Sequence, residues 1–215
     1  MPTTLVMIVM ESTSAPRRKT GRPLSFDRDA ALEKAMLAFW ESGYETTSIS
    51  DLTAAMGVTA PSIYAAFGDK KRLFLEALRL YVGDPDDLEK AFARAPTARD
   101  AVAEMIENAA RLFTGETTPR GCLLASAVAT GSKDAYDVRD AAAQERRVIR
   151  SIIVKRIERD IEREILPPST RSEVVADLAL AVTQGMSVLA RDGVDRETLL
   201  EVAKESMAGW QCQGA

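Results

Sequence analysis

The sequence predicts an all-α protein in which a small N-terminal domain of three to four helices precedes a larger helical C-terminal domain. Apolar residues mostly recur every three or four positions and rarely alternate, which is typical of helices. Aromatic residues make up only 6% of the chain, and glycine and proline interrupt the periodicity at short intervals. With 215 residues and 46% apolar composition, the chain can bury a substantial core.

Composition excludes several functional classes. The chain has 28 Lys and Arg against 32 Asp and Glu, so any contact with nucleic acid must be local. It has no histidine, which removes the commonest general base and metal ligand. Cys122 and Cys212 lie far apart, without the spacing of a zinc site or a disulfide framework. We therefore expect no catalytic residues, no metal and no cofactor.

Residues 1–23 are expected to be a disordered leader and a basic arm. The apolar stretch 5–9 is too short to span a bilayer, and the basic cluster follows it, unlike in a signal peptide. The sequence thus favours a cytoplasmic protein with no membrane partner. The cations of the arm are Arg17, Arg18, Lys19 and Arg22. Such an arm is either a solvated tail or a segment that lies in the minor groove of DNA.

Four helices are expected in a domain spanning residues 24–82. Asp27 suits the N-cap of the first helix, and Gly43 suits a left-handed position at its end. Ser48 followed by Asp51 is typical of a capping box that begins a short second helix. Thr59 is expected to cap the third helix.

The third helix tolerates Pro61 in its first turn, where backbone N–H groups lack helical partners. A longer fourth helix is expected from Lys70 to about Val82. The residues expected to be buried in these four helices are Leu32, Ala35, Met36, Phe39, Trp40, Ile49, Leu52, Met56, Ile63, Phe67, Leu73, Phe74, Ala77, Leu78 and Tyr81.

A second helical domain is expected over residues 86–215, because Gly83, Asp84 and Pro85 interrupt the periodicity after the fourth helix. Its helices are expected at about 86–94, 98–114, 121–130, 134–165, 170–191 and 195–210.

The two short helices from Ile49 to Phe67, joined by a glycine turn, match a helix-turn-helix unit. The alternative is a purely structural helical hairpin. The outward positions of the third helix, which is the second helix of this unit, carry small or hydroxyl-bearing residues, which permit close approach to a DNA groove. The stretch TSISDLTAAMGVTAPSIYAAFGDKKRLFLEAL, residues 47–78, resembles the DNA-binding signature of the TetR family of bacterial regulators.

This resemblance implies a ligand-responsive repressor that binds a double-stranded, palindromic DNA operator. It implies that Thr47 caps the second helix near a phosphate and that Tyr64 and Lys70 bind phosphates. It also implies that the start of the third helix, the recognition helix, contacts DNA bases or backbone through Thr59, Ala60, Pro61 and Ser62. The DNA-binding residues expected in all are Arg17, Arg18, Arg22, Thr47, Thr59, Ala60, Pro61, Ser62, Tyr64 and Lys70.

One helix-turn-helix buries too little surface to be specific, so two copies about 34 to 36 Å apart are expected. The resemblance implies a homodimer formed by the last two long helices. The alternative is that their apolar stripes face the core of their own subunit. The residues expected at the interface are Leu178, Val182, Gly185, Met186, Leu189, Leu199 and Val202.

The middle helices are rich in apolar residues, which fits either a cavity or ordinary core packing. The resemblance implies a small-molecule effector there, and the pocket residues expected are Met105, Phe113, Leu124, Val128 and Tyr136. Cys122 is a candidate redox sensor, because a helix N-terminus and Arg120 can lower the pKa of a thiol. A buried, unreactive cysteine is the alternative.

Two further functions remain open at this point. One is a helical enzyme that keeps the N-terminal fold, although the chain lacks histidine, a glycine-rich phosphate loop and a cysteine cluster. The other is a ligand-sequestering or scaffold dimer, favoured by the alanine-rich third helix.

Overall fold

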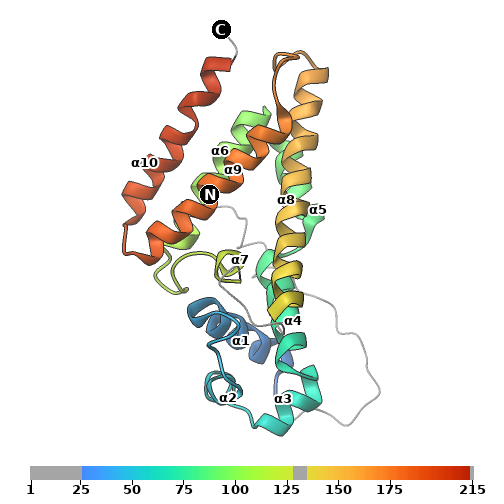
Figure 1. Ribbon diagram of the computed structural model, residues 1–215, viewed down its shortest axis with the longest axis vertical. Coiled ribbons are helices and arrows are strands. Elements are labelled where there is room, and N and C mark those ends of the chain that lie inside the picture. Colours follow the sequence, from blue (N-terminus) through green and yellow to red (C-terminus); the bar gives the residue numbers. More distant parts are fainter. Residues whose placement is uncertain (1–25, 128–134, 214–215) are drawn as a thin grey trace.

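The computed structural model describes residues 26–127 and 135–213, and the elements in these ranges are helices joined by turns (Figure 1). The prediction of an all-α fold is confirmed. The leader and the basic arm, with Arg17, Arg18 and Arg22, lie outside the described residues. Helices α2 and α3 lie at one end of the molecule, and the C-terminal helices form the other end (Figure 1).

The N-terminal helices are α1 (Arg28–Ser42), α2 (Ile49–Met56), α3 (Ala60–Phe67) and α4 (Lys70–Val82). Asp27 caps α1 by accepting the N–H groups of Asp29 and Ala30. The expected capping box is present, since the Ser48 hydroxyl accepts the Asp51 N–H and the Asp51 carboxylate accepts the Ser48 N–H. This reciprocal pair satisfies two N–H groups that a helix leaves unpaired.

Two capping predictions were wrong in detail. Gly43 has a positive φ of 83° but an extended ψ of 166°, so it does not adopt the left-handed helical conformation. Thr59 occupies the N-cap position of α3, but its side chain caps no N–H group of the helix. Its hydroxyl lies 2.9 Å from that of Ser62 and is engaged there.

The core of this end of the molecule is aromatic. Phe39 and Trp40 of α1 are fully buried, and Phe39 meets Phe74 of α4 edge to face, with 5.1 Å between ring centroids. Tyr44 packs on the same pair, at 6.2 Å from Phe39 and 5.2 Å from Phe74. This cluster holds α1 against α4 and provides the base on which α2 and α3 pack.

The C-terminal helices are α5 (Pro85–Arg94), α6 (Ala98–Phe113), α7 (Leu123–Ser126), α8 (Tyr136–Glu162), α9 (Ser172–Arg191) and α10 (Arg196–Ser206), followed by the 3-10 helix η3 (Ala208–Gln213). Most begin and end near the expected residues. Two differ: α7 ends after one turn, at Ser126, and the last helix changes to 3-10 geometry where the sequence predicted α-helix to residue 210.

A buried ion pair fixes the corner between α5 and α6 on α8. Asp160 is fully buried and accepts hydrogen bonds from Arg156 Nε at 3.1 Å and from the Ala98 N–H at 2.5 Å. The Arg156 guanidinium also donates to the carbonyls of Phe92, Ala95 and Pro96, which lie at this corner. Each charge is therefore paired and hydrogen-bonded, as buried charges require.

The two ends of the molecule share one continuous core and several polar contacts. The Trp40 indole N–H donates to the Gly121 carbonyl at 2.9 Å, and Arg191 Nη2 donates to the Trp40 carbonyl at 2.8 Å. Lys71 at the start of α4 pairs with Asp137 at the start of α8, with 2.6 Å between Nζ and Oδ2. The segment around Gly121 is therefore linked to α1 by a hydrogen bond.

Candidate DNA-binding interface and effector cavity

Helix α3 lies at one end of the molecule (Figure 1), and its outer side is exposed. Ile63 and Phe67 are buried on its inner side, while Pro61, Tyr64 and Ala65 are exposed on its outer side. Because these outer residues include small side chains, the helix axis can approach a DNA groove closely. Helix α2, the Gly57 turn and α3 thus have the arrangement of a helix-turn-helix.

Arg28 of α1 contacts α3 on its inner side, which the sequence did not indicate. Its guanidinium carbon lies 4.4 Å from the centroid of the Phe67 ring, and its Nη2 pairs with Glu76 of α4 at 2.6 Å. The arginine therefore connects α1, α3 and α4.

The predicted DNA-binding residues of α3 and α4 are placed on or near its surface. Thr59, Pro61 and Tyr64 are exposed, and Tyr64 has 49% of its surface accessible. Ala60 and Ser62 are half-buried. These residues cluster at the N-terminal half of α3, the part that meets base edges in helix-turn-helix proteins.

Lys70 is half-buried beside the loop that follows α1. Its Nζ donates to the Glu45 carbonyl at 3.3 Å and lies 4.6 Å from the centroid of the Tyr44 ring. Burial lowers the pKa of Lys70, and the negative charges of Glu45 and Asp51 act in the opposite direction. These contacts hold the ammonium group at the start of α4.

Thr47 was wrongly predicted to cap α2, because Ser48 is the N-cap residue. The Thr47 side chain is only 2% exposed, and its hydroxyl donates to the Gly43 carbonyl at 2.6 Å. It therefore stabilises the loop between α1 and α2 and is not available to a phosphate. The pairing of Ser48 with Asp51 was the sequence signal that identifies the true cap.

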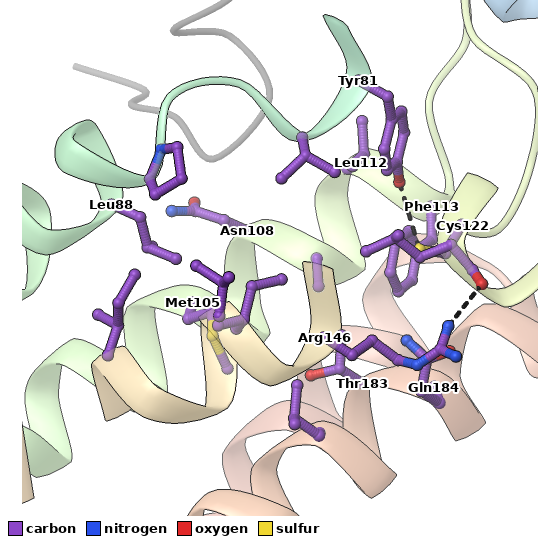
Figure 2. A pocket seen from close by; sticks show the side chains of 18 of the residues that line it. Tyr81, Leu88, Met105, Asn108, Leu112, Phe113, Cys122, Arg146, Thr183 and Gln184 are labelled. Atoms are coloured by element: carbon purple, nitrogen blue, oxygen red, sulfur yellow. Dashed lines mark hydrogen bonds between the residues drawn. The ribbon is translucent and has the colours of Figure 1, made fainter. Parts of the chain in front are cut away.

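A cavity of about 90 Å³ lies between α4, α5, α6, α8 and α9 (Figure 2). Met105, Phe113 and Leu124 line it, as the sequence predicted. Tyr136 was a wrong prediction, because it is 58% exposed and its ring lies under the Arg139 guanidinium instead. Val128 lies outside the described residues.

One side of the cavity is polar, which the sequence did not indicate. Figure 2 shows Arg146, Thr183 and Gln184 together on this side, whereas Leu88 and Met105 lie on the other. Arg146 Nη1 donates to the Leu124 carbonyl at 3.0 Å. Arg146 lies in a charge-rich stretch of α8 that looks solvated in sequence, so the signal for its inward orientation was absent.

Cys122 is buried in the cavity wall, and its environment opposes the prediction of a lowered pKa. Burial raises the pKa of the Cys122 thiol, while the hydrogen bond that the Tyr81 hydroxyl donates to it, at 3.4 Å, acts in the opposite direction. Arg120 donates to the Val194 carbonyl at 3.0 Å. The alternative of a buried, unreactive cysteine therefore fits the structure. Within the described residues, no cluster of Cys, Asp and Glu could hold a metal ion.

Helix α9 has a buried side and an exposed apolar side. Leu178 and Leu189 are exposed as expected for an interface, Gly185 is exposed, and Val182 and Val202 are half-buried. Met186 and Leu199 were wrongly assigned to this interface, because they are 1% and 0% exposed in the core of their own subunit. We define the α9 face as its exposed small and apolar residues, Val174, Leu178, Ala181, Gly185, Val188 and Leu189.

By length and composition, α9 is also the one helix of the described chain that could cross a membrane. This is weak support for a span, because core helices of soluble proteins meet the same criterion. Its inner side packs against α6 and α8, and its apolar exposure is confined to one stripe.

The arrangement of α2 and α3 defines the chain as a helix-turn-helix DNA-binding protein. Residues 31–77 match the family model of bacterial regulatory proteins of the tetR family. Together with the relatives described next, this match shows that the chain belongs to the TetR family.

Two relatives from Escherichia coli K12 align along nearly the whole chain. The HTH-type transcriptional repressor ComR is 34% identical over 206 residues, which cover 93% of this chain and 96% of ComR. The HTH-type transcriptional repressor BdcR is 30% identical over 203 residues, covering 92% of this chain and 94% of BdcR.

Solved structures show the same architecture. A cysteine mutant of the TetR family regulator CifR, in complex with 26-base-pair operator DNA, is 41% identical, with a TM-score of 0.83 over 88% of this chain and 100% of CifR. FadR of Bacillus subtilis, solved with stearoyl-CoA, is 14% identical with a TM-score of 0.68 over 85% of this chain and 96% of FadR, and shows the fold alone.

Proposed function

We propose that this protein is a cytoplasmic transcriptional repressor that binds a palindromic operator as a homodimer and is released by a small-molecule effector. The observation that carries the proposal is the outward face of α3, which is anchored by buried Ile63 and Phe67 and is free of bulky charged side chains. The likeness to the operator-bound CifR mutant supports it.

In this proposal, the start of α3 enters the major groove. Ala60 and Pro61 can contact thymine methyl groups, and the hydroxyls of Thr59 and Ser62 can reach base edges or the backbone. Tyr64 and Lys70 donate to phosphate oxygens. The arginines Arg17, Arg18 and Arg22 bind the adjacent minor groove.

The α9 face supports the proposed dimer. Its large members recur at the spacing of one helical face, and Ala181 and Gly185 between them permit close approach of a second helix. Val202 of α10 extends this surface. Two subunits joined here would present two recognition helices to successive major grooves, about 34 to 36 Å apart.

The cavity is connected to the DNA-binding end through α4 and α1, which supports release by an effector. Tyr81 of α4 lines the cavity and donates to Cys122. The Cys122 N–H donates to Ser187 of α9 at 2.8 Å, and neighbouring Gly121 accepts the indole N–H of Trp40. A ligand that binds one arrangement of these groups better than another shifts the equilibrium between two separations of the recognition helices.

The test is binding of the full chain to DNA upstream of its own gene, measured by electrophoretic mobility shift at several salt concentrations. Lys70→Ala should weaken binding to all sequences and reduce the slope of log K against log salt by about one per subunit, because a phosphate contact is lost. Lys155→Ala, which removes an exposed lysine of α8, is the control and should leave the slope unchanged.

The proposal is contradicted if the wild-type protein fails to bind this DNA at low salt, both alone and with candidate ligands. Selection of bound fragments from random genomic DNA provides a second measurement. A discrete, palindromic set of fragments is expected, and genome-wide binding without discrete sites would favour a sequestering role.

A further inference from the structure

The cavity between α6, α8 and α9 contains a cation that its own surroundings do not balance. Arg146 lines the cavity, and its guanidinium forms no ion pair with any carboxylate of the described residues. Apart from Arg146 and Asp84, the residues that line the cavity carry no formal charge. A partly buried charge without a counter-charge is unfavourable, so this arrangement is suited to a partner that brings a negative charge.

Among the described residues that line the cavity, the acidic one is Asp84, and its carboxylate is already hydrogen-bonded elsewhere. Asp84 lies at the edge of the cavity, but it is exposed, and its carboxylate accepts the Asp86 N–H at the start of α5. Burial lowers the pKa of Arg146, and the neighbouring Arg147 acts in the same direction, whereas the Cys122 thiol acts in the opposite direction. Since that thiol has a raised pKa, it is neutral near pH 7 and supplies no counter-charge.

Arg146 has donors to spare. A guanidinium carries five N–H donors, and in the described structure one nitrogen, Nη1, is engaged by the Leu124 carbonyl. Thr183 lies beside Arg146 (Figure 2) and donates its hydroxyl hydrogen to the Ala179 carbonyl at 2.8 Å, so its hydroxyl oxygen can still accept a hydrogen bond. The Gln184 side chain lies on the same side (Figure 2) and adds amide donors.

Across the cavity from Arg146, Figure 2 shows the apolar side chains of Leu88 and Met105, with the amide of Asn108 beside Leu88. Ile152 also lines the cavity, whose volume is about 90 Å³.

We infer that the effector of this cavity is a small-molecule carboxylate with an apolar group, its carboxylate held by Arg146 and its apolar group directed toward Leu88 and Met105. The inference rests on the proposed function in taking this cavity as the effector site. Charge-assisted hydrogen bonds to a guanidinium then distinguish a carboxylate from its neutral analogue. Arg146 also donates to the Leu124 carbonyl, and Leu124 lies close in sequence to Gly121, which accepts the indole N–H of Trp40.

The experiment compares two isosteric pairs, butanoate with butanamide and benzoate with benzamide, by calorimetric titration of the full chain without DNA. The wild-type protein is expected to bind at least one carboxylate about tenfold or more tightly than its amide. Arg146→Gln should reduce this ratio to about one, and Arg146→Lys should retain part of it.

Arg147→Gln is the matched control. Arg147 is the next residue on α8 but is exposed and pairs with Asp140 and Gln144 outside the cavity, so the ratio should stay at the wild-type value. Thermal unfolding of each variant identifies any that does not fold. If Arg146→Gln does not fold, the wild-type ratio and the Arg146→Lys variant carry the test.

Three results would overturn the inference: equal binding of carboxylate and amide by the wild type, binding of neither pair, or an unchanged ratio in folded Arg146→Gln. Operator binding is measured separately with the same preparations. DNA binding without a carboxylate preference would refute this ligand class and leave the repressor proposal intact. A carboxylate preference in a protein that binds no DNA would refute the repressor proposal and leave the ligand class intact.

Discussion

At the scale of single residues, burial decides which side chains are available for chemistry. Thr47 and Cys122 both belong to types that can act at functional sites, but both are enclosed and hydrogen-bonded within the protein. Tyr64 keeps about half of its surface accessible and is positioned to act on a partner. Residue type alone does not make this distinction, because it depends on packing partners distant in sequence.

The Cys122 thiol should react slowly with iodoacetamide in the native protein. Burial raises its pKa, so less thiolate is present at a given pH than in free cysteine, and access is restricted. In a Cys212→Ser background, the alkylation rate at pH 8 should be more than about tenfold lower in native than in denatured protein. Equal rates would contradict the burial of this side chain.

The same shift has a consequence for stability. Since the pKa of Cys122 is higher in the folded than in the unfolded chain, the protonated thiol contributes to the free energy of unfolding, and this contribution is fully present below the ordinary thiol pKa. That contribution is lost as the pH rises through the folded-state value.

At the scale of elements, helix ends and corners are held by specific polar groups. The α2 capping box involves neighbours in sequence, whereas the corner between α5 and α6 depends on Arg156 and Asp160 of distant α8. The first arrangement is readable from a short motif. The second requires knowing which helices are adjacent.

Replacing Asp160 with alanine should lower the free energy of unfolding by about 3 to 5 kcal/mol, because Arg156 remains buried without its counter-charge. Urea unfolding followed by circular dichroism measures the change. Asp177→Ala is the control, since Asp177 is in an exposed pair with Arg150, and such pairs contribute little. Equal effects of the two substitutions would refute the buried pair.

At the scale of the whole molecule, the α9 face is an exposed apolar stripe that the described helices leave uncovered. It contains four of the large exposed apolar residues, Val174, Leu178, Val188 and Leu189. Contiguous exposed apolar patches on soluble proteins commonly mark interaction surfaces. In the proposed dimer, the second subunit covers the α9 face.

Leu178→Glu should convert the dimer to a monomer at micromolar concentration, because it places a charge in the proposed interface. Sedimentation velocity measures the mass, and the variant should also lose high-affinity operator binding. Ile165→Glu, at an exposed apolar residue outside the α9 face, should remain dimeric. A wild-type protein that is monomeric at all accessible concentrations would contradict the prediction.

The sequence predicted the helices and the helix-turn-helix well, because periodicity, capping residues and glycine breaks are local signals. The effector pocket was implied by the resemblance to the TetR family, and the apolar residues Met105, Phe113 and Leu124 of the middle helices line the cavity. Met186 and Leu199 were assigned to the wrong side, since adjacent stripes on one helix differ by a rotation that only the neighbouring helices determine. Arg146 was missed because a charged residue in a polar stretch of helix is usually exposed.

Helix α9 contributes Thr183 and Gln184 to the cavity and Gly185 and Val188 to the α9 face. In the proposed dimer, a shift of this helix caused by ligand binding changes the contact between subunits. Reciprocity of binding free energies then requires subunit association to change ligand affinity by the same factor. The affinity for the ligand therefore depends on protein concentration.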